Sequence, residues 1–191
     1  MHIRMFEIAK DYLEKTYEYN VVAGFISPSH DTYVSNKLRK KGEPFITANH
    51  RYSMSLSSAY FKRVAMCALA ADENESTKSW ITADSWESDL EIFIGSLDVA
   101  ADIDKTIHKQ IPHRQFKVMY LCGADLVVRC SGMKSFQRKY TVIAVGREKY
   151  TDRCLELKKE KNLTNIIFLT DDADDVSSTQ IRGSLEKKSV E

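Results

Sequence analysis

FKVMYLC, residues Phe116–Cys122, is a largely apolar run in which hydrophobic and polar side chains do not alternate. Two runs of the same kind follow it, YTVIAV at Tyr140–Val145 and NIIFLT at Asn165–Thr170, and a charged helix is predicted between them at Tyr150–Lys161. Strands without alternation are buried on both faces, as in a parallel sheet covered by helices. The pattern therefore predicts an α/β fold, a Rossmann-like doubly wound parallel sheet with helices on both faces.

Helices and strands also alternate before Phe116. Hydrophobic periodicity predicts three helices, at Met1–Lys15, Leu56–Ala71 and Glu87–Gln110, the last with a break near Gly95. Two strands are expected among them, at Tyr19–Ser27 and at WITA from Trp80. Doubly wound folds normally begin with a central strand, whereas this sequence begins with an amphipathic helix. We therefore expect that a first strand, and the loop after it, are missing from this sequence.

The composition is that of a globular protein. Its 191 residues predict one domain spanning 1–191, with an inserted or irregular loop at about 29–57 and a frayed tail at 186–191. Hydrophobic residues make up 43%, charged residues 29%, and the net charge is +1, which argues against a nucleic-acid coat or a membrane-surface patch. We find no transmembrane span or signal peptide in the sequence. Four scattered cysteines indicate reduced thiols in an intracellular protein.

The stretch DDVSSTQIRGSLEKK, Asp174–Lys188, places hydroxyl, amide and guanidinium side chains at the start of a predicted helix. The first turn of a helix offers unpaired N–H groups and the positive end of a dipole, which favour an anion. Ser177 and Gln180 also have the spacing of a capping box. From the residues alone, both a phosphate site and a helix cap are open.

Six segments occur in an order that resembles one enzyme family. They are MHIRMFEIAKDYLEKT from Met1, GFISPSHDTY from Gly24, SAYFKRVAMCALA from Ser58, ADSWES from Ala83, LCGADL from Leu121 and DDVSSTQIR from Asp174. Together they resemble the eukaryotic-type nicotinamide/nicotinate mononucleotide adenylyltransferases, members of the nucleotidyltransferase superfamily. The resemblance implies adenylyl transfer from ATP, with Mg²⁺, to nicotinamide or nicotinate mononucleotide, giving NAD or its deamido form and pyrophosphate.

The sequence also departs from the family pattern. The opening strand and its G-x-F-x-P loop are absent, so His2 alone remains of an H-x-x-H-type signature. About a dozen residues near Phe45–Ser57 look inserted, and no tryptophan lies between Leu126 and Tyr140. The helix after S-S-T-x-I-R is short. We expect a chain truncated at both ends.

By resemblance, one group of residues holds ATP: His2, Ser178, Thr179, Gln180, Ile181 and Arg182. His2 and Arg182 are the expected catalytic residues, because an imidazole in a first helical turn can donate to phosphates and a guanidinium pairs their oxygens bidentately. The alternative for His2 is a frayed terminal residue. Such chemistry needs positioning and charge neutralisation rather than a covalent nucleophile. No metal-ligand set is expected in the protein itself.

A second group is implied to bind the mononucleotide: Gly123, Asp125, Phe93, Ser96 and Lys40. Glycine permits close backbone approach and aspartate accepts hydrogen bonds from a ribose or an amide, although Asp125 could instead be a helix N-cap. Phe93 could stack on a pyridinium ring or pack in the core. Lys40 could contact a phosphate or belong to a solvated cluster.

Two further functions stay open. The chain could be a catalytically inactive homologue that binds only nucleotide or a partner protein, or a transferase for another acceptor. The resemblance also implies a homo-oligomer in the nucleus or cytoplasm, with small-molecule substrates and no nucleic acid or membrane partner.

Overall fold

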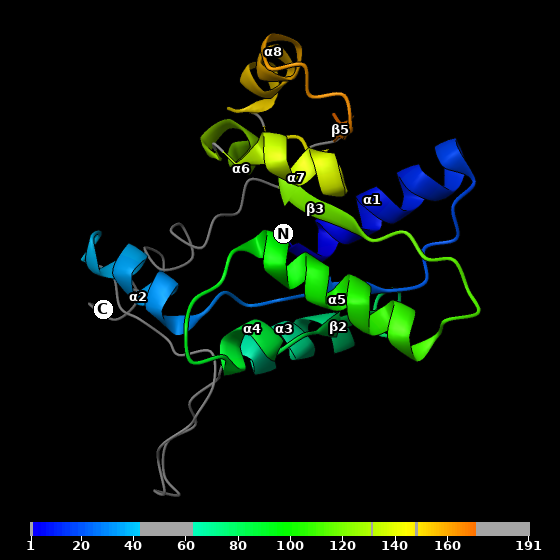
Figure 1. Cartoon of the computed structure of the whole chain (residues 1–191), viewed down its shortest axis with the longest axis vertical. Helices are drawn as coiled ribbons and strands as arrows, with labels where there is room; N and C mark the ends of the chain where they lie inside the picture. Colours follow the sequence, from blue (N-terminus) through cyan, green and yellow to red (C-terminus); the bar gives the residue numbers. More distant parts are fainter. Residues whose placement is uncertain (1, 43–62, 131, 148, 171–191) are drawn as a thin grey trace, which may run out of the picture. The chain divides into compact units, whose positions relative to one another are not determined.

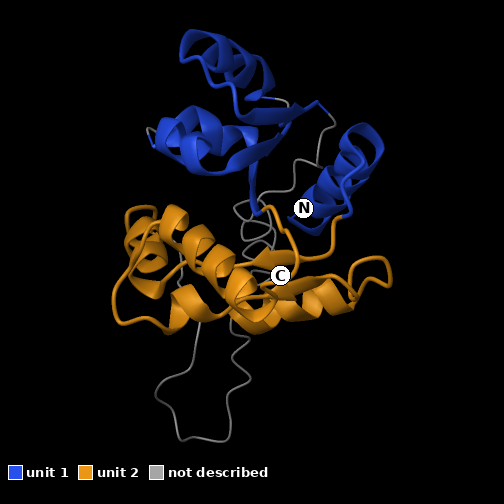
Figure 2. Cartoon of the chain, turned by 45° about the vertical axis from the view of Figure 1, so that its right-hand side comes forward, with its two compact units in different colours: residues 1–20, 118–191 blue, residues 21–117 orange. Residues whose placement is uncertain are grey.

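The structure, a computed structural model, describes residues 2–42, 63–130, 132–147 and 149–170 (Figure 1). The chain divides into two compact units, coloured separately in Figure 2. The first unit combines Met1–Asn20 with Val118–Glu191, and the second is Val21–Lys117. Each unit has its own parallel sheet.

The sheet of the first unit consists of β3 (Met119–Gly123), β4 (Thr141–Val145) and β5 (Ile166–Leu169), hydrogen-bonded in that order. Both pairings are parallel. Every residue of the central strand β4 is buried. A strand buried along its whole length carries apolar residues on both faces, which is why the sequence of β4 shows no alternation.

Four helices accompany this sheet: α1 (His2–Tyr17), α6 (Ala124–Arg129), α7 (Met133–Lys139) and α8 (Thr151–Glu160). Helix α1 packs on β3 and β4 through Met5, Ile8 and Leu13, which lie three to five residues apart on one face. Helix α7 packs on β4, and α6 packs on α8. The parallel sheet flanked by helices confirms the predicted Rossmann-like α/β class.

Asn162 ends helix α8 in a left-handed backbone conformation, with φ of 49°. Its N–H donates to Lys159 O at 3.2 Å, and the next N–H, that of Leu163, donates to Lys158 O at 2.9 Å. These two bonds are the pair that defines a Schellman motif, in which the apolar residue that follows is typically packed against the helix. Leu163 is fully buried here. The motif turns the chain from α8 into β5.

The sheet of the second unit pairs β1 (Gly24–Ile26) with β2 (Ile81–Ala83), also in parallel. Its helices are α2 (Asp31–Arg39), α3 (Arg63–Asp72), α4 (Trp86–Asp89) and α5 (Ser96–Gln110). Helix α3 packs on β2, and the fully buried Thr77 hydroxyl donates to Ala71 O at 3.0 Å near the end of that helix.

The described strands form two separate parallel sheets, the pair β1-β2 in the second unit and the set β3-β4-β5 in the first. The single-domain organisation itself stays a prediction.

Three segments differ from the sequence-based expectation. The interval 29–57 was expected to be irregular, but its part Asp31–Arg39 is helical, because His30 supplies an N-cap whose side chain accepts from the Thr32 N–H. Strand β1 is shorter than the predicted Tyr19–Ser27. Residues 124–139, left without elements, contain the short helices α6 and α7. The predicted break near Gly95 is confirmed, since Gly95 is the N-cap of α5.

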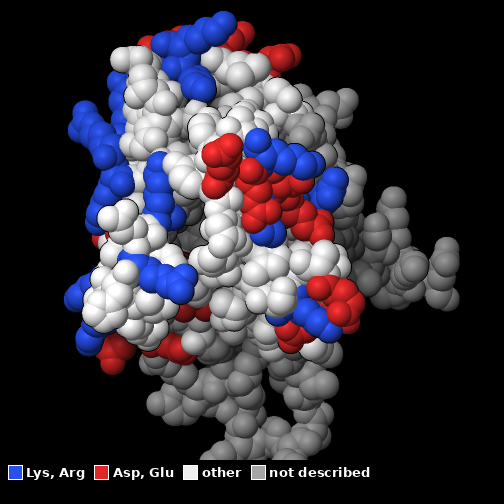
Figure 3. Space-filling model, turned by 90° about the vertical axis from the view of Figure 1, so that its right-hand side faces the viewer, with Lys and Arg blue, Asp and Glu red and all other residues white. Residues whose placement is uncertain are grey.

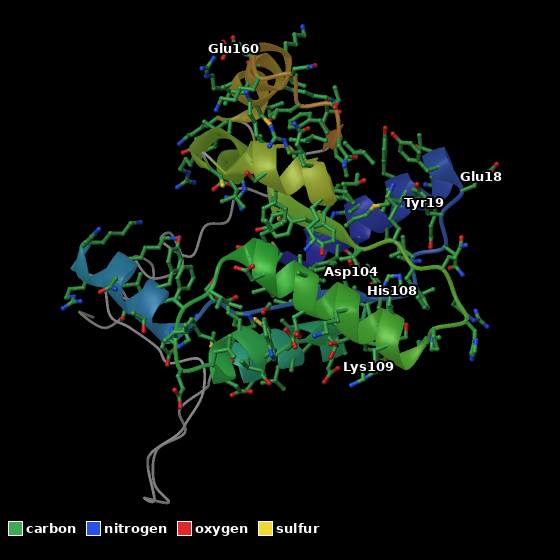
Figure 4. All side chains as sticks on the ribbon, in the orientation of Figure 1. Glu18, Tyr19, Asp104, His108, Lys109 and Glu160 are labelled. Carbon is green, nitrogen blue, oxygen red and sulfur yellow. The ribbon has the colours of Figure 1, made fainter. Side chains whose placement is uncertain are left out.

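Charged side chains of both signs lie beside one another on the face drawn in Figure 3, as the net charge of +1 would suggest. Many pairs are one helical turn apart. On α5, His108 Nδ1 lies 3.1 Å from Asp104 Oδ1, one turn away (both labelled in Figure 4). On α8, Arg153 Nη1 lies 3.0 Å from Glu160 Oε1, two turns away. Among the described helices, none is both long and apolar enough to cross a membrane.

Candidate functional site

The candidate site of the first unit lies where β3 and β4 end. Gly123 and Val145 are register partners at the carboxyl ends of these strands. The residues two positions further along each chain, Asp125 and Arg147, therefore come together, with Arg147 Nε 3.3 Å from Asp125 Oδ1. Open α/β sheets bind ligands at this edge.

The pairing of Asp125 with Arg147 is largely shielded from solvent. The two side chains are 18% and 17% exposed. Asp125 also forms an ion pair through Oδ2 with Arg129, one turn later on α6, whose side chain is 61% exposed. The Arg129 guanidinium lies 5.4 Å from the centre of the Tyr150 ring, within the range of a cation–π contact. One oxygen of the Asp125 carboxylate thus pairs with the mostly buried Arg147, and the other pairs with the exposed Arg129.

A glycine is required at position 123 because there is no space for a side chain. Its backbone angles, φ −81° and ψ 154°, would suit any residue. An added Cβ would lie 2.6 Å from Asp125 Oδ1 and 2.8 Å from Arg147 Nε. The absence of a side chain at Gly123 lets the carboxylate and the guanidinium meet directly over the strand end.

His2 begins helix α1, which packs on β3 and β4. Burial lowers the pKa of its imidazole, the positive charge of Arg147 lowers it further, and the Asp125 carboxylate opposes the shift. His2 therefore lies within electrostatic reach of both residues. It keeps exposed surface, so solvent weakens these effects. The structure thus places Asp125 directly over Gly123 and His2 within electrostatic reach of Asp125.

The other expected mononucleotide residues lie in the second unit. Phe93 is 45% exposed, which excludes full core burial, and its ring stacks on that of Tyr33 with centroids 5.1 Å apart and planes at 14°. Ser96 begins α5 and is exposed. Lys40 is the exposed residue that ends α2. At 5.1 Å between ring centres, Tyr33 occupies one face of Phe93, so a planar ligand would use the other face or displace Tyr33.

A buried network holds the Tyr33–Phe93 pair in place. The His30 N–H, three residues before Tyr33, donates to Glu87 Oε1 at 2.9 Å. The His30 ring links two backbones: Nδ1 accepts from Thr32 N–H at 3.2 Å, and Nε2 lies 3.1 Å from Leu90 O, three residues before Phe93. Since Nδ1 accepts, the ring is the neutral tautomer that donates from Nε2. Burial raises the pKa of the Glu87 carboxyl.

The remaining expected ATP contacts, Ser178, Thr179, Gln180, Ile181 and Arg182, lie outside the described residues. Within the described ranges, no group of three or more His, Cys, Asp or Glu side chains could hold a metal ion. Sequence reasoning missed Arg147, Arg129 and Tyr33. Arg147 follows the predicted strand Tyr140–Val145 by two residues, and Asp125 follows the predicted strand Phe116–Cys122 by three, so the sequence places both after strand ends but does not pair them.

The parallel sheets and their flanking helices define a Rossmann-like α/β protein. The chain is 27% identical over 158 residues to "Nicotinamide/nicotinic acid mononucleotide adenylyltransferase" of Arabidopsis thaliana, covering 78% of this chain and 56% of the relative. Proteins of the same name in Schizosaccharomyces pombe and in Oryza sativa are 32% and 33% identical, covering 66% of this chain and 31% and 42% of theirs. The chain is a homologue of these adenylyltransferases, as the sequence motifs indicated.

The chain matches only part of each of these relatives. The chain spans about half, or less, of the length of these relatives. No protein-family model matches it.

Proposed function

We propose that the protein transfers the adenylyl group of ATP to nicotinamide or nicotinate mononucleotide, giving NAD or its deamido form and pyrophosphate. The observation that supports the proposal is the position of Asp125 directly over Gly123 at the carboxyl edge of β3, with His2 within electrostatic reach of Asp125, in a homologue of adenylyltransferases. In the reaction, an oxygen of the mononucleotide's 5′-phosphate bonds to the α-phosphorus of ATP. The bond from that phosphorus to the bridging oxygen of the β-phosphate breaks, and pyrophosphate leaves with the electron pair.

The roles of the residues follow from charge and position. His2, at the first turn of α1, donates a hydrogen bond to the polyphosphate. Arg182, Ser178 and Thr179, with Gln180 and Ile181, bind the phosphates from the segment after β5. Mg²⁺ enters bound to ATP and supplies charge neutralisation. Because these groups position the phosphates and neutralise their charge, no covalent enzyme intermediate is needed.

The acceptor is bound by a second set of groups. Asp125 accepts hydrogen bonds from a ribose or an amide, and Gly123 permits close approach. Phe93 stacks on the pyridinium ring through the face that Tyr33 leaves open, with Ser96 beside it. Lys40 contributes positive charge to the mononucleotide phosphate. We also propose a homo-oligomer that resides in the nucleus or cytoplasm.

The competing function is nucleotide binding without turnover. Under this alternative, ATP or NAD binds to the site while the α-phosphorus is never brought into line with an acceptor.

A single experiment separates the two functions. The purified protein is incubated with ATP, Mg²⁺ and nicotinamide mononucleotide, and NAD is measured by coupled reduction to NADH, with pyrophosphate measured in parallel. Equal amounts of NAD and pyrophosphate, lost in Asp125→Asn, support transfer. Calorimetric binding of ATP without product supports the alternative. Neither binding nor product would refute both.

A further inference from the structure

We propose that Arg147 is a positioning residue of this site: its guanidinium holds the Asp125 carboxylate over Gly123, in the orientation in which Asp125 receives the ligand. The proposal rests on the proposed function for the identity of the ligand, a nucleotide. It rests on the structure alone for the pairing of Asp125 with Arg147. Arg147 matches none of the motifs by which the site was recognised.

The first support is the way two strands bring the pair together. Arg147 is fixed by the end of β4, and its N–H donates to the Thr151 hydroxyl at 3.1 Å, which itself donates to Arg147 O at 2.9 Å. The backbone of Arg147 is thereby tied to the first turn of α8. A guanidinium on an anchored backbone loses less conformational entropy when it forms an ion pair. The position of Arg147 is therefore set before any ligand arrives.

The second support is the difference between the two arginines that face Asp125. Arg129 is exposed, and exposed ion pairs contribute little to stability or orientation. Arg147 and Asp125 are both mostly buried, and removal of one partner from a buried pair leaves the other charge uncompensated. Arg147 is therefore the partner that fixes the carboxylate.

The third support is the crowding at Gly123. Asp125 Oδ1 and Arg147 Nε would lie 2.6 Å and 2.8 Å from a Cβ at this position. The two charged groups thus meet in space that only a glycine leaves open. Loss of Arg147 would remove the ion pair that reaches Oδ1 and so release the carboxylate on the side of the strand end.

The charge of the cluster fits an anionic ligand. With a neutral His2, the residues Asp125, Arg129 and Arg147 carry a net charge of +1. The lowered pKa of His2 agrees with the nearness of the Arg147 guanidinium. Arg147 therefore serves a nucleotide site in two ways. It orients the Asp125 carboxylate, and it contributes to a net positive charge that attracts the phosphates of the ligand.

A double-mutant cycle tests the proposal. The dissociation constant of nicotinamide mononucleotide, and separately of NAD, is measured by calorimetry for the wild type, Asp125→Asn, Arg147→Met and the double variant. If Arg147 acts through Asp125, Arg147→Met weakens binding about tenfold in the wild type and less than about twofold in the Asp125→Asn background. The matched control is Arg129→Met, which removes the exposed partner and should change binding less than about threefold. Additive effects of Asp125→Asn and Arg147→Met would overturn the positioning role.

Two further measurements keep the test decisive. Arg147→Lys keeps the positive charge but lacks the planar guanidinium. Compared with Arg147→Met, it should return the His2 pKa, followed by NMR, to the wild-type value, while the affinity for the ligand stays weakened. If the wild type binds neither nicotinamide mononucleotide nor NAD, the proposed function fails. The same cycle, measured on the free energy of unfolding, then decides the pairing: non-additive effects support it, and additive effects refute it.

Discussion

Gly123→Ala tests how tightly the site is built. The change adds one methyl group at a position where the backbone angles suit alanine, so any effect arises from contacts. The new Cβ would lie 2.6 Å from Asp125 Oδ1, whereas real Cβ atoms essentially never approach a neighbour within 3.0 Å. Asp125 must therefore withdraw by at least about 0.4 Å, and Arg147 Nε must also move.

The size of the effect follows from these shifts. A misplacement of about 1 Å at a reacting group can cost about 10²-fold in rate, so a shift of a few tenths of an ångström is expected to weaken nicotinamide mononucleotide binding and turnover roughly tenfold. Stability changes less. The strain of an added methylene, about 1–3 kcal/mol, is offset by about 0.4–1 kcal/mol because alanine restricts the unfolded chain. We expect a fall in melting temperature of a few degrees, at about 2–4 °C per kcal/mol.

Gly132→Ala is the matched control in the same unit. Its Cβ would lie 3.7 Å from Cys130 Sγ, an ordinary contact, so the control should keep full ligand affinity and equal or better stability. Affinity is measured by calorimetry with nicotinamide mononucleotide, and stability by thermal unfolding. Wild-type affinity and stability in Gly123→Ala would refute the crowding argument. If no variant binds nicotinamide mononucleotide, the difference in melting temperature between the two glycine variants still decides it.

Three other predictions concern stability and reactivity. Asn162→Val should lower the free energy of unfolding by about 1–2 kcal/mol in urea titrations, because valine tolerates the left-handed conformation poorly, whereas Asn162→Gly should keep wild-type stability; equal values would contradict the Schellman assignment. Burial raises the pKa of the Glu87 carboxyl above its ordinary 4.5, so the folded protein holds this proton more strongly than the unfolded chain does. The stability of the wild type therefore falls as the pH rises from 4.5 through the raised pKa. Glu87→Gln removes this loss, and its melting temperature relative to wild type should rise from pH 4.5 toward neutral; a constant difference would be evidence against a buried charge. Burial raises the pKa of Cys154 to about 11, so a thiol reagent at about pH 8 should label Cys130 well before Cys154 in the native protein, as read by mass spectrometry; simultaneous labelling would contradict the burial.

The strands were predictable because burial on both faces leaves a clear mark in the sequence. Every position of β4 is apolar or a small hydroxyl residue, and the predicted run Tyr140–Val145 differs from the strand by a single residue. Helix α2 was missed for the opposite reason. Only Leu38 of that helix is buried, so its sequence shows no apolar face, and its start depends on a histidine cap that lies outside the usual cap residues.

The candidate site was predictable only in part. Gly123 and Asp125 were found because a motif marks them, and the strand-end rule placed them at a ligand-binding edge. Arg147 was not, because its partnership depends on the register between Gly123 and Val145, which a single sequence does not specify. Tyr33 was missed because its contact with Phe93 joins segments about sixty residues apart through the His30 network.

The unequal exposure of the two arginines around Asp125 has a consequence for ionic strength. Mobile ions screen charges that face water, with a Debye length of about 8 Å at physiological salt, and act much less on charges enclosed by protein. Added salt would therefore loosen Arg129 from the carboxylate and leave Arg147 in place. The pairing of Asp125 with Arg147 would therefore keep its geometry over a wide range of salt concentration, while the pairing of Asp125 with Arg129 would weaken as the salt concentration rises.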